Sequence, residues 1–255
     1  MKGHDLISTN RHEWLDDAAA LARFDSVALQ WGERTSVMVE DVPALRLLHQ
    51  ALLADREPEA RRRLVALAFD IKVAYLNTSY HVNELAASEN RYLVHDEART
   101  RFRPLEDVQS FGVALLRSRA AFGLVSRIRA LWDKLFLYVT LRFDGDAGVR
   151  RLQARRSRRK HFFSEYGRGI GEISGNTMSV ALADINALEK DYRSPELHGF
   201  GVVPPWVFES PPTWPYGHTS PILRHWDVMR TFLKSAFAEA DGKQCSLDAV
   251  PPNVP

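Results

Sequence analysis

One long apolar stripe constrains the fold of this chain more than any other feature of its sequence. Between residues 105 and 143, large apolar side chains recur at steps of three and four, which is the period of an α-helix. A stripe this wide indicates a central helix that packs against several neighbours at once. We expect the Asp-Gly-Asp at 144–146 to end this helix. Breaks are expected at Gly112 and Gly123, because glycine weakens a helix interior by ~1 kcal/mol. The stripe comprises Leu115, Leu116, Phe122, Val125, Ile128, Leu131, Trp132, Leu135, Phe136 and Val139.

Shorter stripes of the same period flank the central helix on both sides. Pro58 and Pro221 suit the first turn of a helix, where the missing N–H of proline costs nothing. The one stretch with strand character, residues 201–208, is interrupted by two prolines. The chain is therefore predicted to be all-α, a helical bundle with additional N-terminal helices. Flanking helices are expected over residues 15–27 and 45–53, from Pro58 to about Asn83, over 178–188 with Asn176 or Thr177 near its start, and from Ser220-Pro221 through Phe237 to an end at Gly242.

A polar stretch divides the chain. The apolar pattern is interrupted from Ser88 to Arg103, and Pro104 then disfavours helical geometry in the residue before it. We therefore expect an N-terminal helical region over 1–104, a bundle over 105–241 and a flexible tail over 242–255. Periodicity leaves open whether the N-terminal region packs on the bundle or forms its own domain.

Composition excludes several classes of protein. Of the 255 residues, 45% are apolar and 26% are charged, as is usual for a soluble globular protein. A single cysteine, Cys245, excludes an internal disulfide and a cysteine-rich metal site. No apolar run reaches the ~18 residues of a membrane span, and no signal-peptide core is present. We expect a cytoplasmic protein that contacts no membrane. Metal-ligand spacings and phosphate-loop motifs are missing, so neither a metal site nor a cofactor is expected.

The chain as a whole is nearly neutral, with a net charge of +2, but one segment of it is strongly basic. Residues 150–160, here called the basic run, hold seven cations in eleven positions, and Phe162 and Phe163 follow. Cations beside aromatic rings can follow a phosphate backbone and stack bases, which makes RNA a candidate partner. The alternative is a solvated linker or helix face. The candidate RNA-binding residues of the run are Arg155, Arg156, Arg158, Arg159 and Lys160.

A second segment joins an arginine and a histidine across a predicted break. Ser194 and Pro195 suit an N-cap and a first-turn proline, so Arg193 would end one helix and His198 would lie about one turn into the next. Such a break can direct two side chains into one space, which suits a site. It equally suits an ordinary corner, with Arg193 paired to Glu196 or Asp191 and His198 packed at the turn.

This segment resembles the R-x4-6-H motif of the HEPN superfamily, named for higher eukaryotes and prokaryotes nucleotide-binding. The likeness lies in Arg193 and His198 with four residues between them, and in the surrounding Tyr192, Ser194-Pro195-Glu196 and Gly199. Residues 129–135 are also similar to the Asp-Lys/Arg-Leu helix of some HEPN families. The resemblance covers about residues 105–241 and implies a helical bundle.

The resemblance implies metal-independent cleavage of RNA, in which the 2′-hydroxyl attacks the adjacent phosphate. His198 would move a proton and Arg193 would stabilise charge on the phosphoryl oxygens. Asp191, Ser194 and Glu196 would support these two. The resemblance also implies a homodimer, a role in defence or a toxin system, and an antitoxin or other protein partner.

Two departures motivate an alternative function. Ser194 follows the arginine where many active members have Asn, Asp or His, and Phe200 replaces a tyrosine found in one toxin group. The alternative is a non-catalytic HEPN-like module that binds RNA, a nucleotide or a partner protein. Trp206 and Trp214, in the proline-rich connection 200–221, could stack bases or contact a partner, or pin that connection to the bundle.

Overall fold

The computed structural model describes residues 18–34, 57–97, 108–193 and 221–238. Helices dominate these ranges, so the prediction of an all-α fold is confirmed. The elements are α1 (Ala18–Arg34), α3 (Pro58–Glu97), α4 (Val108–Gln153), α5 (Arg158–Tyr166), β1 (Gly169–Ile170), β2 (Ile173–Ser174), α6 (Gly175–Leu188), the π-helix η3 (Glu189–Arg193) and α9 (Pro221–Phe237).

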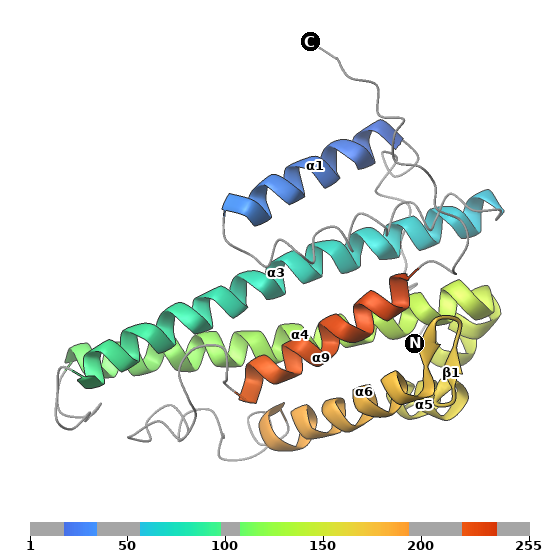
Figure 1. The fold of residues 1–255 in the computed structure, drawn as a ribbon. Helices are drawn as coiled ribbons and strands as arrows, with labels where there is room; N and C mark the ends of the chain where they lie inside the picture. Colours follow the sequence, from blue (N-terminus) through green and yellow to red (C-terminus); the bar gives the residue numbers. More distant parts are fainter. Residues whose placement is uncertain (1–17, 35–56, 98–107, 194–220, 239–255) are drawn as a thin grey trace, which may run out of the picture.

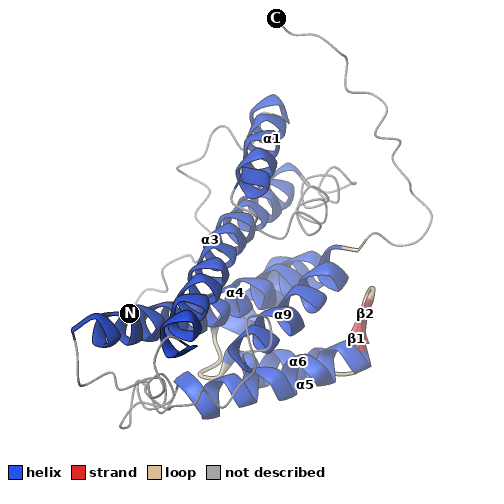
Figure 2. Cartoon of the chain, turned by 60° about the vertical axis from the view of Figure 1, so that its left-hand side comes forward, coloured by secondary structure: helices blue, strands red, loops and turns tan. Residues whose placement is uncertain are grey.

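Helices α3 and α4 form a long antiparallel pair, and α1 lies along α3 (Figure 1). The C-terminal half of α4 is covered by α9 and α5, α6 packs against α9, and the β1–β2 hairpin lies at the start of α6 (Figure 2). The carbonyl oxygens of Ala236 and Ala238, at the end of α9, accept hydrogen bonds from Arg142 of α4 at 2.5 and 3.3 Å. Helix α4 is thus the central helix that its apolar stripe predicted.

The core forms because α4 presents large apolar side chains to several neighbours. The Trp132 ring contacts that of Phe232 on α9, with centroids 5.0 Å apart, and Phe136 stacks on Phe162 of α5 at 4.6 Å. All four side chains are almost fully buried, which supplies the main driving force for packing these helices. Helix α3 joins the same core through Leu64, Leu67, Ala68, Ile71, Tyr75 and Leu85.

Not every member of the predicted stripe is buried. Leu115, Leu116 and Phe122 are exposed by 40% or more, whereas the later members have little or no exposure. These three lie on the N-terminal part of α4, which extends beyond α9 and α6 (Figure 1). Periodicity identified the correct face of α4 but not how far along the helix its partners reach.

The N-terminal helices begin near the predicted positions, but α3 ends later than expected. Helix α3 starts at Pro58 as predicted and continues to Glu97, so the expected end near Asn83 was wrong. The apolar pattern stops before the helix does, because helical hydrogen bonds join backbone groups and do not require apolar side chains.

Two glycines of α4 lie within regular helix, whereas a third interrupts it. Gly112 and Gly123 lie inside the helix, so the predicted breaks were wrong. A Cβ at Gly123 would lie 3.2 Å from Nδ1 of His81, which shows that this glycine permits close packing against α3. At the predicted Asp-Gly-Asp the helix is interrupted: Gly145, with φ 63° and ψ −158°, leaves helical geometry, and a second helical stretch then runs on to Gln153.

A short hairpin was not predicted. Strands β1 and β2 have two residues each, too few for an alternating pattern, and pair antiparallel with Ile170 opposite Ile173. Gly171, with φ 54°, allows the turn and lies against the Phe143 ring. The N-cap of α6 is Ser174, whose Oγ accepts a hydrogen bond from the Thr177 N–H at 3.1 Å, so the predicted start at Asn176 or Thr177 was slightly late.

Some predictions lie outside the described residues: the helix over 45–53, the boundary at 104, the segment 201–208 and the tail 242–255. The last helix starts at Pro221, as predicted, and ends at Phe237, before the predicted end at Gly242. Within the described ranges, no helix combines the length and the apolar character that a bilayer span requires.

Candidate nucleic-acid interface

The basic run forms the junction between two helices. Arg150 and Arg151 lie in the last turn of α4, residues 154–157 connect, and α5 begins at Arg158. Hydrogen bonds from the Ala154 and Arg155 N–H groups back to carbonyls of α4 hold the start of this connection. The run is therefore a helix end, a turn and a helix start, and four of its seven cations lie around one region at the junction.

A pocket of about 380 Å³ opens at this junction and is here called the cationic pocket. Five arginines and two carboxylates line it, which leaves three net positive charges. Such a concentration of guanidinium groups is typical of phosphate recognition, because the planar guanidinium can donate two parallel hydrogen bonds to one anion. The lining residues are Arg129, Asp133, Arg155, Arg156, Ser157, Arg158, Arg159 and Glu189.

Arg129 brings the central helix into the pocket. Its Nη1 donates to Oδ1 of Asp133, one turn along α4, at 2.6 Å, and its Nε donates to Oε1 of Glu189. Burial alone would lower the pKa of Arg129, but these two carboxylates outweigh it and raise that pKa. Arg129 is thus charged and held in one orientation. The opposite face of the same turn carries Leu131 and Trp132 into the core.

Glu189 connects the cationic pocket to η3. It is the first residue of this π-helix, contacts Arg129 and lies 3.9 Å from Nη1 of Arg159. The same short π-helix ends at Arg193. Single turns of π-helix occur frequently at functional sites. The basic run and the helix that ends at Arg193, which are far apart in the sequence, therefore meet at Glu189.

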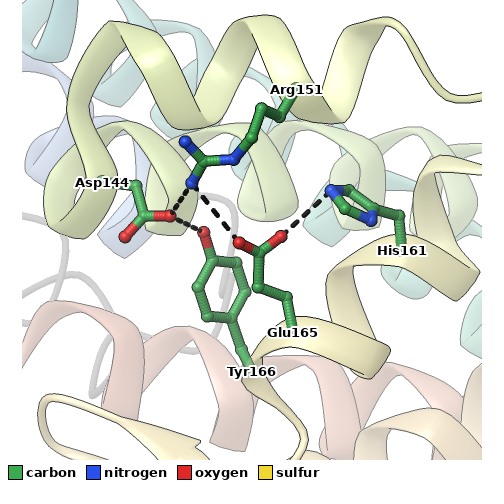
Figure 3. Close-up of polar contacts among 5 residues, drawn as sticks. All are labelled: Asp144, Arg151, His161, Glu165 and Tyr166. Carbon is green, nitrogen blue, oxygen red and sulfur yellow. Dashed lines mark hydrogen bonds and ion pairs between the residues drawn. The ribbon is translucent and has the colours of Figure 1, made fainter.

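A polar network fastens α5 to α4 beside the pocket (Figure 3). The Tyr166 hydroxyl donates to Oδ2 of Asp144 at 2.6 Å, and Arg151 bridges Asp144 at 2.7 Å and Glu165 at 3.3 Å. His161 Nε2 lies 3.0 Å from the same Glu165. Burial and the nearby Asp144 raise the pKa of Tyr166, which keeps its hydroxyl protonated as a donor. The network fixes how α5 leaves α4 and so orients the arginines between them.

The aromatic residues after the basic run belong to the core. Phe162 has no exposed surface and Phe163 has 8%, and both pack against Phe136. They are not accessible for the base stacking that the sequence suggested. Of the candidate RNA-binding residues in the basic run, Arg159 is half-buried. The other four are exposed: Arg155, Arg156, Arg158 and Lys160.

The motif segment, residues 193–198, is described only at its start. Arg193 is the last residue of η3, so it ends a helix as predicted, and Asp191 is exposed on the same element. The other predicted site residues lie outside the described part of the chain. The position of His198 relative to Arg193 is therefore outside it as well. These residues are Ser194, Glu196, His198, Trp206 and Trp214.

One buried polar pair was missed by sequence reasoning. His225 Nδ1 of α9 lies 2.7 Å from Oδ1 of Asp184 on α6, and both side chains are 4% exposed. The edge of the Tyr192 ring meets the His225 ring, with centroids 5.6 Å apart. The pair thus joins α6, η3 and α9 next to Arg193. The sequence signal for this pair was weak, because each residue is only a polar side chain next to an apolar core residue on an amphipathic helix.

In the described ranges, no three His, Cys, Asp or Glu side chains lie together in a way that could hold a metal ion. Comparison with protein-family models, with curated proteins and with solved structures finds no match for this chain. The character of the site therefore follows from its own residues, which form a cationic pocket suited to an anionic ligand.

Proposed function

We propose that this chain is an endoribonuclease of HEPN type, in which the cationic pocket holds the RNA backbone while Arg193 and His198 act on a phosphodiester. The observation that carries the proposal is the contact of Glu189 with Arg129, which joins the pocket to the helix that ends at Arg193. A nuclease needs its phosphate-binding cations beside its reacting groups.

The proposed reaction needs no metal ion. The RNA 2′-oxygen attacks the adjacent phosphorus, the bond from phosphorus to the 5′-oxygen breaks, and the products are a 2′,3′-cyclic phosphate and a 5′-hydroxyl. His198 takes the proton of the 2′-hydroxyl or gives one to the leaving 5′-oxygen. Arg193 stabilises negative charge on the phosphoryl oxygens. Asp191, Ser194 and Glu196 orient these two side chains.

The proposal extends to the assembly and its setting. In HEPN enzymes two motifs meet across a dimer interface, so we propose a cytoplasmic homodimer. Its proposed role is in defence or as the toxin of a pair, with an antitoxin or another protein as its partner.

The test is cleavage of RNA by the purified wild type beside Arg193→Ala and His198→Ala, in the presence of a chelator. The expected result is cleavage that leaves cyclic phosphates and falls by about 10²-fold or more in each variant, which is the usual contribution of a general acid or base. Arg127→Ala is the control, because Arg127 is exposed on α4 outside the pocket and is expected to leave cleavage unchanged. Cleavage that survives both substitutions would remove Arg193 and His198 from the mechanism.

A second candidate function is supported by the pocket itself. All its arginines lie on described helices or the turn between them, so RNA binding requires neither Arg193 nor His198. In this alternative the chain is a non-catalytic module. Binding that is lost when Arg155 and Arg158 are neutralised, kept in His198→Ala, and accompanied by no cleavage of varied RNAs would favour it.

A further inference from the structure

Helix α5 begins in a way that is unfavourable for an isolated helix. Its first turn carries Arg158, Arg159 and Lys160 and contains no acidic residue. The N-terminal end of a helix bears partial positive charge, so cations there repel it and anions are favoured. The N-cap residue, Ser157, makes no side-chain hydrogen bond to the first turn.

The start of α6 shows the contrast within the same molecule. There the N-cap, Ser174, accepts a hydrogen bond from the Thr177 N–H, and the first turn carries no cation. The start of α5 therefore has two properties that α6 lacks: a cap that makes no side-chain bond, and three cations that an anion would stabilise. Both Ser157 and Arg158 line the cationic pocket, so an anion in the pocket would meet this end of the helix.

The charges of the pocket are only partly matched from within the described chain. Asp133 and Glu189 engage Arg129, and Glu189 also approaches Arg159. The side chains of Arg155, Arg156 and Arg158 form no ion pair or hydrogen bond with another described residue. Three guanidinium groups and a helix N-terminus thus remain available to one ligand.

We infer that the cationic pocket binds a terminal phosphate monoester of an RNA strand. An internal phosphodiester carries one negative charge, whereas a terminal monoester carries about −1.5 to −2 at neutral pH. Three surplus positive charges around one open pocket favour the doubly charged group. This inference rests on the proposed function in one respect, that RNA carries the phosphate. A free nucleotide offers the same chemistry, and the experiment separates the two sources.

The experiment measures binding of 2′-O-methyl oligoribonucleotides, which lack the attacking hydroxyl and cannot be cleaved, to the wild-type protein. Three labelled oligonucleotides of one sequence carry a phosphate at the 5′ end, at the 3′ end or at neither end. At about 0.15 M salt, where long-range attraction is screened, one phosphorylated form is expected to bind about tenfold tighter than the unphosphorylated form.

Two double variants with the same loss of charge assign the effect to the pocket. Arg155→Gln with Arg158→Gln is expected to abolish the tenfold difference. Arg127→Gln with Arg150→Gln, at exposed positions outside the pocket, is expected to keep the tenfold difference.

Several outcomes would overturn the inference. These are equal binding of all three oligonucleotides, a difference that survives Arg155→Gln with Arg158→Gln, and competition by a nucleoside 5′-monophosphate as strong as that of the phosphorylated oligonucleotide. Preference for the terminal phosphate without any RNA cleavage would instead overturn the nuclease proposal and support the pocket. Cleavage without the preference would overturn only the inference about the pocket.

Discussion

At the scale of single residues, we expect Glu189 to set how readily the cationic pocket accepts the proposed phosphate. Its carboxylate holds Arg129 and lies within reach of Arg159, so an entering phosphate competes with it for two guanidinium groups. It also begins the π-helix that ends at Arg193. Displacement of Glu189 by a ligand would therefore act on the backbone that carries a proposed catalytic residue.

We predict that Glu189→Gln tightens binding of the phosphorylated oligonucleotide by about fivefold, or about 1 kcal/mol, because a competing charge is lost and the shape is kept. Fluorescence anisotropy measures the change. Glu59→Gln is the matched control, because Glu59 is exposed in the first turn of α3 and lies outside the pocket. Unchanged or weaker binding to Glu189→Gln would show that Glu189 does not compete with the ligand.

At the scale of elements, α5 is held firmly to α4, but its first turn has no capping side-chain hydrogen bond and no acidic residue. Phe162 and Phe163 hold it to α4 from within the core, and the Asp144 network holds it from outside (Figure 3). The stability lost at its first turn is thereby offset by tertiary packing, which lets the helix present cations where an isolated helix would favour anions.

We predict that Ser157→Asp stabilises the protein and weakens phosphate binding together. A carboxylate at the N-cap can accept from the first-turn N–H groups and oppose the cations there. The free energy of unfolding should rise by about 1 kcal/mol in urea denaturation. The same carboxylate repels the ligand, so the phosphorylated oligonucleotide should bind about fivefold more weakly.

Ser174→Asp is the matched control at the start of α6, where a side-chain cap already exists. It is expected to leave oligonucleotide binding unchanged. If Ser157→Asp raised stability while binding stayed at the wild-type level, the N-terminus of α5 would have no part in the phosphate site.

At the scale of the whole molecule, α1 is joined to the bundle through a charged residue that lies fully inside. Lys72 of α3 has no exposed surface, forms an ion pair with Asp25 of α1 and lies 5.2 Å from the centroid of the Phe24 ring. Burial lowers the pKa of Lys72 to about 7, because removal from water disfavours the ammonium form. In the unfolded chain this pKa returns towards its ordinary value of 10.5.

We predict that the free energy of unfolding rises as the pH increases from about 7 towards 10. In this window the unfolded chain holds a proton on Lys72 that the folded chain lacks, so higher pH favours the folded state, by at most about 1.4 kcal/mol per pH unit. Below pH 7 both states hold the proton and this contribution is constant. Urea denaturation at several pH values measures the slope.

Lys72→Met combined with Asp25→Asn is expected to remove this slope. The matched control is Lys134→Met combined with Asp70→Asn, because Lys134 and Asp70 form a more exposed ion pair at 3.0 Å between α4 and α3. Equal slopes in the wild type and in the Lys72 double variant would contradict the assignment.

The all-α fold was predictable because helical periodicity records which face of each segment is buried, and proline marks where a helix can begin. The start of α3 at Pro58, the start of α9 at Pro221 and the central position of α4 followed from these two signals. The end of α3 did not, because a polar helix carries no apolar period. The β1–β2 hairpin did not either, since two residues are too few to alternate.

The sequence by itself determined the charge of the basic run and the helical nature of its flanks. Only the tertiary structure decided that this run forms a pocket, because Arg129 and Glu189 lie on other elements and reach it through the packing of α4 and η3. The same holds for Asp184 and His225, which are 41 residues apart and pair inside the bundle. Local periodicity reports whether a side chain is covered, whereas the identity of its neighbour depends on how whole helices pack.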